Sequence, residues 1–312
     1  MSKTVLLATE KAFAASAVDA IDGVLTKAGY TLKKLENYKD SSELVGAVAD
    51  VDAMIIRSDL ATKEVIDAAP KLKVITRAGA GFDNIDLEAA KAKEVVCQNT
   101  PGANANAVAE LVFGMMVTVV RNNFDGSSGT ELKGKTLALH GCGNVSVNVI
   151  RVAKGFGMRC ISYDPFLKPE QITERGAEPV DSVAALFKAD FVTLHIPATP
   201  ETKGSINKEL LLSMPKGGTL INTARKEVID EAGMVEAFTE RPDLRYIADV
   251  KPDNLETLRA ACGDKADKRV MVTVKKMGAQ TLEANNNAGI QAAEQIVAFF
   301  EKGEKGPWVN RW

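Results

Sequence analysis

The distribution of hydrophobic residues over the first hundred positions predicts short strands that alternate with helices. Runs rich in branched apolar residues predict strands at 4–9, 30–35, 53–58, 72–79 and 94–99. Between them, apolar residues recur at helical spacing over 16–29, 41–51, 62–70 and 86–93. Parallel strands need a long crossover connection, usually a helix, so this alternation indicates a parallel sheet covered by helices on both faces.

A helix that is apolar nearly all round follows this first series. In "NTPGANANAVAELVFGMMVTVVRN", Pro101 and Gly102 precede the helix, and Glu110 is the only charge before Arg121. Such a helix must be buried on several sides. We expect it to lie between two domains or between two subunits.

A second alternating series begins after the polar connector "NNFDGSSGTELKG". It predicts strands at 135–141, 158–164, 191–197, 218–224 and 244–250, helices at 145–157, 182–190, 207–215 and 229–240, and a final amphipathic helix at 287–303. The length of 312 residues exceeds that of one typical domain. The predicted fold class is therefore α/β, with two doubly wound parallel-sheet domains.

Composition narrows the classes of partner. Hydrophobic residues make up 46% of the chain and charged residues 26%, and the net charge is −2, which gives no electrostatic reason to expect nucleic acid. The start "MSKTVLLATEKAF" lacks the pattern of a signal peptide, and the longest apolar stretch, 111–120, is about half a membrane span. We expect a cytoplasmic protein without a nucleic-acid or membrane partner.

The cysteines give no sign of a disulfide framework or a metal site. Cys97, Cys142, Cys160 and Cys262 are widely spaced, and no two of them form a CxxC pair. We expect small buried hydrophobic residues in a reducing compartment, and no metal.

The stretch "LALHGCGNVS" has the pattern of a dinucleotide-binding turn. Gly141, Gly143 and Ser146 form G-x-G-x-x-S directly after a predicted strand and before a predicted helix. Gly141 would make the tight turn, and Gly143 would let the backbone approach a pyrophosphate. Asn144 and Val145 would present N–H groups at the helix N-terminus, where the dipole favours an anion. Without further context, a plain strand-to-helix turn fits this pattern equally well.

A carboxylate farther along supports the cofactor interpretation. Asp164 lies 21 residues after Gly143, at the end of the next predicted strand, where it can accept hydrogen bonds from both ribose hydroxyls. Pro165 and Phe166 offer no cation for a 2′-phosphate. This favours NAD over NADP, although Lys168 leaves NADP open.

With these residues in place, the chain resembles the D-isomer-specific 2-hydroxyacid dehydrogenases over essentially its full length. The matching motifs are "RAGAGFDNID", "NTPGANANAVAEL", "GCGNV…YDP", "VTLHIPATPETKG", "INTARKEVIDE" and "MGAQTLEA". Within that family, it is most similar to the short phosphoglycerate dehydrogenases that lack the ACT domain and carry lysine in place of the usual catalytic histidine.

The resemblance implies an architecture and a reaction. A Rossmann NAD-binding domain (103–281) would be inserted into a flavodoxin-like substrate-binding domain (1–102 and 282–312), with the catalytic cleft at their junction. A homodimer would form around the nucleotide domain and the apolar helix. The implied reaction is NAD-dependent oxidation of the small molecule D-3-phosphoglycerate to 3-phosphohydroxypyruvate, the first step of serine biosynthesis.

The resemblance also implies roles for individual residues. Arg225 matches the arginine that binds the substrate carboxylate and polarises its C2 oxygen. Its position after a buried-looking strand favours this role. Taken alone, Arg57 could equally be a solvated loop charge and Arg77 part of a strand-end ion pair. The resemblance implies substrate contacts from Arg57, Ser58, Arg77, Asn104 and the backbone N–H groups of Gly79 and Ala80, and cofactor contacts near the nicotinamide from Thr223, Ala224 and Asp249.

The residue that moves the proton departs from the usual family pattern. In "VTVKKMGAQT" the family histidine falls on Lys276, and its glutamate partner falls on Asn254. A carboxylate beside a lysine would raise a pKa that is already about 10.4, whereas a lysine base needs partial burial and a nearby cation. Arg225 would supply that cation, so we predict that Lys276 is the acid/base. The alternatives are two solvated lysines at an inactive site, a shift to Lys275, or interference from Asp253.

The two histidines, His140 and His195, are expected to be hydrogen-bonded side chains at strand ends and not catalysts. Two other functions stay open. One is a reductase for hydroxypyruvate, glyoxylate or a related keto acid, and the other is an NAD-binding regulatory protein like the C-terminal-binding-protein corepressors, because fold does not determine function.

Overall fold

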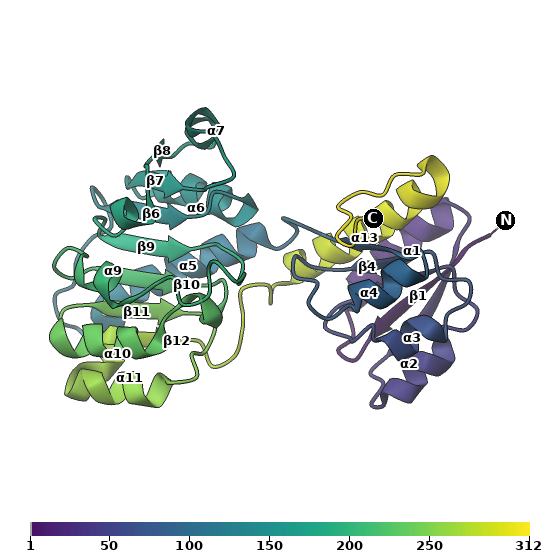
Figure 1. The fold of residues 1–312 in the computed structure, drawn as a ribbon, viewed down its shortest axis with the longest axis horizontal. Coiled ribbons are helices and arrows are strands. Elements are labelled where there is room, and N and C mark those ends of the chain that lie inside the picture. Colours follow the sequence, from purple (N-terminus) through teal and green to yellow (C-terminus); the bar gives the residue numbers. More distant parts are fainter. Residues whose placement is uncertain (1) are drawn as a thin grey trace. The chain divides into compact units, whose positions relative to one another are not determined.

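The computed structural model describes residues 2–312 and consists of two compact units (Figure 1). Unit 1 contains the residues up to Asn104 together with Gln280–Trp312, and unit 2 contains Ala105–Ala279. The resemblance placed the corresponding boundaries after residue 102 and before residue 282. The functional names of the two domains stay predictions.

Unit 1 is built on a five-stranded parallel sheet with the strand order β2-β1-β3-β4-β5. Its strands are β1 (Thr4–Thr9), β2 (Thr31–Glu36), β3 (Ala53–Ile56), β4 (Val74–Arg77) and β5 (Val96–Asn99). Its helices are α1 (Ala15–Lys27), α2 (Ser41–Ala47), α3 (Lys63–Asp67), α4 (Leu87–Ala92) and the last helix, α13 (Leu282–Lys302).

Each face of this sheet has its own hydrophobic core, because successive side chains of a strand point to opposite faces. Leu6 and Met54 belong to the core that includes residues of α2, α3 and α4. Val5 and Ile55 belong to the core shared by α1 and α13, to which α13 contributes Ile296. A segment from the end of the chain therefore completes the unit that the beginning of the chain starts.

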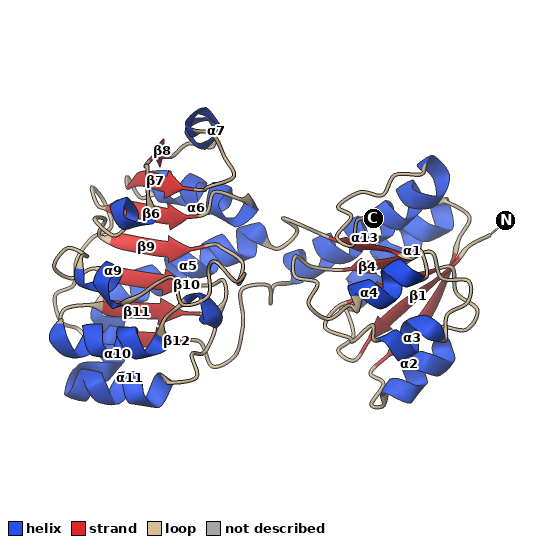
Figure 2. Cartoon of the chain, in the orientation of Figure 1, coloured by secondary structure: helices blue, strands red, loops and turns tan. Residues whose placement is uncertain are grey.

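Unit 2 is built on a seven-stranded parallel sheet with the order β12-β11-β10-β9-β6-β7-β8 (Figure 2). Its strands are β6 (Thr136–His140), β7 (Arg159–Tyr163), β8 (Glu178–Pro179), β9 (Phe191–Leu194), β10 (Thr219–Asn222), β11 (Arg245–Ala248) and β12 (Val270–Val272). Its helices are α5 (Ala105–Val120), η1 (Asn122–Phe124), α6 (Asn144–Gly155), α7 (Pro169–Glu174), α8 (Val183–Leu186), α9 (Lys208–Leu212), η2 (Lys226–Val228), α10 (Glu231–Glu240), α11 (Leu255–Cys262), η3 (Gly263–Lys265) and α12 (Ala266–Arg269).

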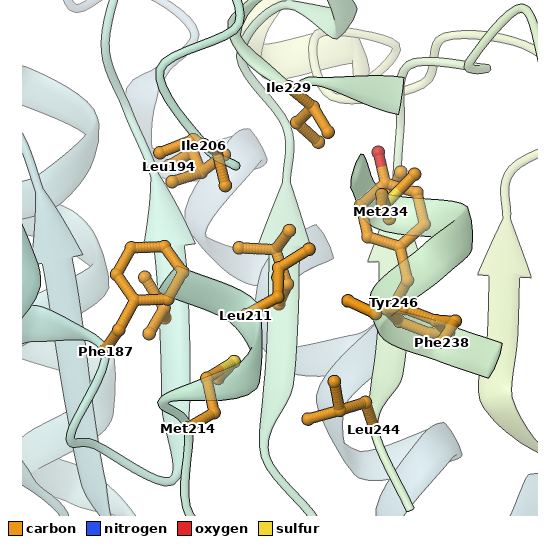
Figure 3. Close-up of a cluster of buried hydrophobic side chains, with 14 of the residues drawn as sticks. Phe187, Leu194, Ile206, Leu211, Met214, Ile229, Met234, Phe238, Leu244 and Tyr246 are labelled. Atoms are coloured by element: carbon orange, nitrogen blue, oxygen red, sulfur yellow. The ribbon is translucent and has the colours of Figure 1, made fainter. Parts of the chain in front are cut away.

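Two cores again cover the two faces of the sheet. Figure 3 shows one of them, in which Tyr246 of β11 lies with Leu211 of α9 and with Met234 and Phe238 of α10. The adjacent strand residue Ile247 belongs to the opposite core, with residues of α5 and α6. The fold class predicted from the sequence, two doubly wound parallel-sheet domains, is confirmed.

Eight elements of unit 2 were not predicted from the sequence, namely α7, β8, α11, α12, β12 and the short helices η1, η2 and η3. The two strands among them have two and three residues, too few to show an alternating pattern. Several predicted strands also end earlier in the structure. Arg57 and Ser58, for example, follow β3 and belong to a loop.

The apolar helix α5 is buried mostly within unit 2. Its buried residues from Ala109 to Val120 pack into the core that α6 also covers. Asn106, Glu110 and Gly114 are exposed, and Leu111 and Val117 are partly buried. Burial of the helix from Ala109 onward is therefore explained inside one unit, and a subunit interface along it stays a prediction.

All four cysteines are buried and unpaired, as the sequence predicts. None of the helices in residues 2–312 combines the length and the hydropathy needed to cross a membrane. Within the same range, no cluster of three or more histidine, cysteine or carboxylate side chains could hold a metal ion.

Candidate active site

The turn between β6 and α6 requires glycine at its first position. Gly141 has φ +87°, and a Cβ at this position would lie 2.9 Å from the carbonyl oxygen of His195. Gly143 has φ −84°, and a Cβ there would meet no atom within 4 Å. The space above Gly143 is therefore open to a ligand that approaches the backbone.

The N-terminus of α6 can receive an anion. No side chain caps this helix and its first turn has no acidic residue, so the N–H groups of Asn144 and Val145 have no capping carboxylate. Ser146 is fully buried, and its hydroxyl donates to the carbonyl oxygen of Gly141 at 2.7 Å. That hydrogen bond explains why serine is tolerated where glycine or alanine is usual.

Asp164 is held beside this turn at the carboxyl end of β7. One carboxylate oxygen accepts the backbone N–H of Cys142 at 2.9 Å, and the other accepts that of Phe166 at 3.0 Å. A carboxylate has about four acceptor positions, so both oxygens keep capacity for a further hydrogen bond. The arrangement suits the ribose contact predicted for Asp164.

Arg175 is a neighbour of this turn that the sequence did not reveal. It is the C-cap residue of α7, and its guanidinium donates to the carbonyl oxygen of Cys142. The two residues are 33 positions apart, and no sequence pattern connects them. Arg175 therefore supports the loop that carries Gly141 and Gly143.

The two histidines lie at the carboxyl ends of β6 and β9. Burial lowers the pKa of His140 to about 4 and that of His195 to about 3. His195 Nε2 is 3.0 Å from Thr193 Oγ1, but His140 Nδ1 has no hydrogen-bond partner in residues 2–312. The expectation that both rings are fully hydrogen-bonded is therefore wrong for His140. Both rings are neutral at pH 7.

Asn222 shapes the backbone that carries Arg225, and it too was missed from the sequence. This fully buried residue ends β10; its amide oxygen accepts the N–H of Ala224 at 3.0 Å, and its amide nitrogen donates to the carbonyl oxygen of Arg225 at 2.8 Å. Arg225 Nη1 lies 3.0 Å from the oxygen of Ala224. The hydroxyl of Thr223 is buried and has no partner within residues 2–312.

Asp249 anchors the loop that carries Lys276. Its carboxylate is only 2% exposed and accepts three hydrogen bonds, from Thr273 Oγ1 at 2.9 Å and from the backbone N–H groups of Met277 at 2.6 Å and Gly278 at 2.8 Å. The cofactor contact predicted for Asp249 stays a prediction. Its observed contacts hold the backbone directly after Lys276.

No carboxylate stands at the position of the usual glutamate partner. The side-chain amide of Asn254 donates to the backbone oxygen of Glu231 at 2.7 Å. The neighbouring Asp253 binds Lys226 Nζ with both oxygens, at 2.6 and 2.7 Å. Lys276 itself is exposed, so the partial burial expected for a lysine base is absent in this structure.

In unit 1, Arg57 is held in place by three neighbours. Its guanidinium donates to Asn285 Oδ1 at 2.7 Å and to the carbonyl oxygen of Lys11 at 3.3 Å, and it lies 4.8 Å from the ring centre of Phe13. Burial lowers the pKa of Arg57 from its ordinary value. Arg57 is therefore not a freely solvated loop charge.

Asp59, a further residue missed from the sequence, fixes the loop that contains Arg57. Its carboxylate is 2% exposed and accepts the N–H groups of Arg57 at 2.9 Å and Glu10 at 2.6 Å and the hydroxyl of Tyr38 at 2.9 Å. Arg77 Nε donates to the carbonyl oxygen of Arg57 at 2.9 Å. The two arginines thus lie at the carboxyl ends of the paired strands β3 and β4.

The loop at Gly79 and Ala80 follows β4. Gly79 has φ +149°, and a Cβ there would overlap the guanidinium of Arg77, so the arginine side chain lies across this glycine. The N–H of Gly79 donates to the carbonyl oxygen of Arg77 at 2.9 Å, whereas that of Ala80 has no acceptor in residues 2–312. Of the two N–H groups predicted to face a substrate, only that of Ala80 is thus without an intramolecular bond.

The remaining predicted substrate residues lie in the same unit. Ser58 is exposed directly after Arg57, and Asn104 is partly buried directly before α5. Unit 1 therefore contains every predicted substrate-binding residue other than Arg225. Unit 2 contains Arg225, Lys276 and every predicted cofactor residue.

The open turn at Gly143, the uncapped helix and the held carboxylate of Asp164 fit a dinucleotide at the carboxyl edge of the unit 2 sheet, as in NAD-dependent oxidoreductases. Residues 107–262, all within unit 2, match the family described as D-isomer specific 2-hydroxyacid dehydrogenase, NAD binding domain. The chain belongs to this family of NAD-dependent enzymes.

Three similar proteins show the range of this family. A D-3-phosphoglycerate dehydrogenase of Methanocaldococcus jannaschii is 38% identical over 81% of this chain and 51% of its own length. A hydroxypyruvate reductase of Thermotoga maritima is 35% identical over 91% of this chain and 97% of its own length. The NAD+-bound 3-phosphoglycerate dehydrogenase of Entamoeba histolytica is 42% identical, has a TM-score of 0.88 and is matched over 100% of both chains. This chain thus spans about half the length of the Methanocaldococcus relative.

Proposed function

We propose that this chain oxidises D-3-phosphoglycerate to 3-phosphohydroxypyruvate with NAD, the first step of serine biosynthesis. The observation that carries the proposal is the pair Arg57 and Arg77, two guanidinium groups at neighbouring strand ends that are linked through the Arg57 carbonyl oxygen. Guanidinium groups match the geometry and charge of a phosphate, which hydroxypyruvate and glyoxylate lack. The 42% identity to the Entamoeba 3-phosphoglycerate dehydrogenase supports the same substrate.

The predicted residues divide between the substrate and the cofactor. Arg225 binds the substrate carboxylate and polarises the C2 oxygen. Arg57, Ser58, Arg77 and the Ala80 N–H hold the rest of the substrate. Gly143, Asn144, Val145 and Asp164 would hold the pyrophosphate and ribose of NAD, which would supply the hydride acceptor for C2, and Thr223, Ala224 and Asp249 are the predicted contacts near its nicotinamide.

Lys276 is the proposed acid/base. In the oxidation, its neutral amine accepts the proton of the C2 hydroxyl as hydride leaves C2, and it then releases the proton to water. Lys276 is exposed in this structure, and the neighbouring positive charge proposed to favour its neutral form is that of Arg225. Asp249 contributes by holding the backbone of Met277 and Gly278.

The test is the rate of NAD reduction with 3-phosphoglycerate between pH 7 and 10, for the native chain, Lys276→Met and the matched control Lys275→Met. We expect kcat/KM of the native chain and of Lys275→Met to rise with pH through one ionisation, because the base must be neutral. Lys276→Met should lose at least about 100-fold in kcat, the usual contribution of a general base, and the pH dependence with it.

Two outcomes would contradict the proposal. Full activity of Lys276→Met, with the ionisation intact, would remove this lysine from the mechanism. Loss of activity in Lys275→Met alone would move the base by one residue. In either case, turnover of 3-phosphoglycerate by the native chain would still support the substrate.

A hydroxypyruvate reductase is the second candidate, favoured by the match over 97% of the Thermotoga enzyme. The comparison that separates the two is kcat/KM for 3-phosphohydroxypyruvate against hydroxypyruvate with NADH, because only the former can use the two arginines for its phosphate. No turnover of either compound, with NAD binding intact, would favour a regulatory protein.

We also propose that the chain forms a homodimer along α5 in the cytoplasm. The partly buried apolar side chains of Leu111 and Val117 are the residues that such an interface would cover. Sedimentation equilibrium of the native chain and of Val117→Glu tests this, since a buried carboxylate would dissociate the dimer.

A further inference from the structure

A positively charged cavity lies in unit 2, at the edge of the sheet opposite to the cofactor turn. Its volume is about 250 Å³, and its lining includes Lys216, Arg245, Lys265, Lys268 and Arg269. We call it the amino-edge cavity, because Lys216 precedes β10, Arg245 begins β11 and Arg269 precedes β12. In Figure 1, this edge is marked by the tails of the β10 and β11 arrows. Cofactors of α/β sheets bind at the other, carboxyl edge.

Two acidic residues near this cavity, Asp243 and Asp125, are already paired with cations. Asp243, which also lines it, forms a two-point ion pair with Arg241, at 2.9 and 2.7 Å. Lys268 pairs with Asp125 at 2.6 Å. Four lining cations therefore have no carboxylate partner within residues 2–312, namely Lys216, Arg245, Lys265 and Arg269.

Arg269 is a preorganised part of the cavity wall. It is only 5% exposed; its Nε donates to the carbonyl oxygen of Leu244 at 3.0 Å, and its Nη2 donates to those of Phe238 and Arg241, each at 2.8 Å. Its Nη1 has no hydrogen bond in the described part of the chain. A guanidinium fixed in this way loses little side-chain freedom when it binds an anion.

Arg245 is a partly buried lining cation whose side chain lacks both a hydrogen bond and an ion pair within residues 2–312. Burial lowers the pKa of Arg245, the direction expected when a cation is partly withdrawn from water without a compensating charge. A half-buried guanidinium that has lost water and gained no acceptor is unfavourable unless an anion binds it.

We propose that the amino-edge cavity binds a phosphorylated small molecule carrying at least two negative charges, separately from substrate and cofactor. Four unpaired cations around one space favour a polyanion over a single carboxylate. Phosphoryl oxygens suit Arg245, whose guanidinium can donate two parallel hydrogen bonds to a phosphate, and Arg269 can add a bond from Nη1. A volume of about 250 Å³ leaves room for more than one phosphoryl group.

Inorganic pyrophosphate is the probe for this proposal, applied to the whole chain at constant ionic strength with NAD at a saturating concentration, so that the cofactor turn is already occupied. A ligand that binds only the folded state raises the thermal midpoint in a saturable way. We expect that rise for the native chain, and at least a tenfold higher half-maximal concentration for Arg245→Gln. The double variant Lys216→Gln with Lys265→Gln changes only exposed side chains and should weaken binding in the same direction.

Two controls separate this cavity from other anion effects. Lys91→Gln removes one exposed positive charge from α4 in unit 1 and should leave the shift unchanged. Arg57→Gln alters the proposed substrate site and should also leave it unchanged. A shift that survives Arg245→Gln, that disappears with Arg57→Gln, or that is absent from the native chain would overturn the proposal.

Sedimentation equilibrium of Arg245→Gln supplies the remaining outcome. If this variant dissociates an assembly that the native chain forms, acidic side chains of a second copy occupy the cavity, and the small-molecule proposal fails. An unchanged molecular mass together with a lost pyrophosphate shift supports it.

Discussion

Three buried polar residues hold the loops of the candidate site in place. Asp59 fixes the loop of Arg57, Asn222 fixes the backbone of Arg225, and Asp249 fixes the loop after Lys276. All three are 2% exposed or less. Each accepts or donates hydrogen bonds to backbone groups near a proposed functional side chain, so each limits where that side chain can go.

The two glycines of the cofactor turn give a prediction at this scale. Gly141→Ala should lower the free energy of unfolding by about 1–3 kcal/mol. Alanine would have to adopt a positive φ at this position, and its Cβ would meet the His195 carbonyl oxygen. Gly143→Ala should change stability by less than about 0.5 kcal/mol, since nothing in the chain lies near its Cβ.

Gly143→Ala should affect the binding of NAD more than it affects stability. Gly143→Ala places a methyl group where the pyrophosphate would lie, so it should weaken NAD binding by about 1–3 kcal/mol while the fold stays intact. Urea unfolding and calorimetric titration with NAD measure the two effects. Unchanged NAD affinity in a folded Gly143→Ala protein would remove the pyrophosphate from this turn.

At the scale of elements, the proposed functional groups lie at the carboxyl ends of neighbouring strands. Buried titratable side chains lie at the same ends. β6 and β9 are paired, and His140 and His195 lie where these strands end. Burial lowers the pKa of both rings well below 7, so their protonation state is linked to stability.

The pKa of His140 predicts acid sensitivity of unit 2. Burial lowers it to about 4, below the ordinary value of about 6.5, so the unfolded chain binds this proton first as pH falls. The contribution of His140 to the free energy of unfolding is fully present above pH 6.5 and decreases below it, by about 2 kcal/mol at pH 5. Urea unfolding of His140→Gln should therefore show a smaller loss between pH 7.5 and 5 than the native chain. Equal losses would contradict the pKa shift.

At the scale of the whole molecule, the two units differ in how the chain builds them. The hydrophobic cores of unit 2 use residues of one continuous segment. Unit 1 needs α13 from the end of the chain, since Ala288, Ala292 and Ile296 complete the core against α1. The two units should therefore respond differently to loss of the last segment.

A chain that ends at Ala279 tests this difference. We expect it to bind NAD with the affinity of the full chain, because the sheet, both cores and the cofactor turn of unit 2 remain. Unit 1 should lose protection against limited proteolysis, because the face of its sheet that α13 covers becomes exposed. Loss of NAD affinity together with the protease protection would show that unit 2 depends on α13.

The sequence alone was sufficient for the fold class, the family and the cofactor. Strand and helix periodicities are local, and the turn at Gly141 and Gly143 with Asp164 spans a single strand–helix–strand unit, so a linear pattern can reveal them. Short elements such as β8 and β12 were not predicted, because two or three residues cannot show a period.

Only the tertiary structure decided which distant residues support the site. Tyr38 and Asp59, Arg175 and Cys142, and Asp249 and Gly278 meet across separations of 21, 33 and 29 positions. The same is true of the amino-edge cavity, where cations that look like scattered surface charges in the sequence surround one space. The physical reason is that hydrogen bonding and charge clustering depend on which strand ends and loops are neighbours in space, and periodicity along the chain does not specify that.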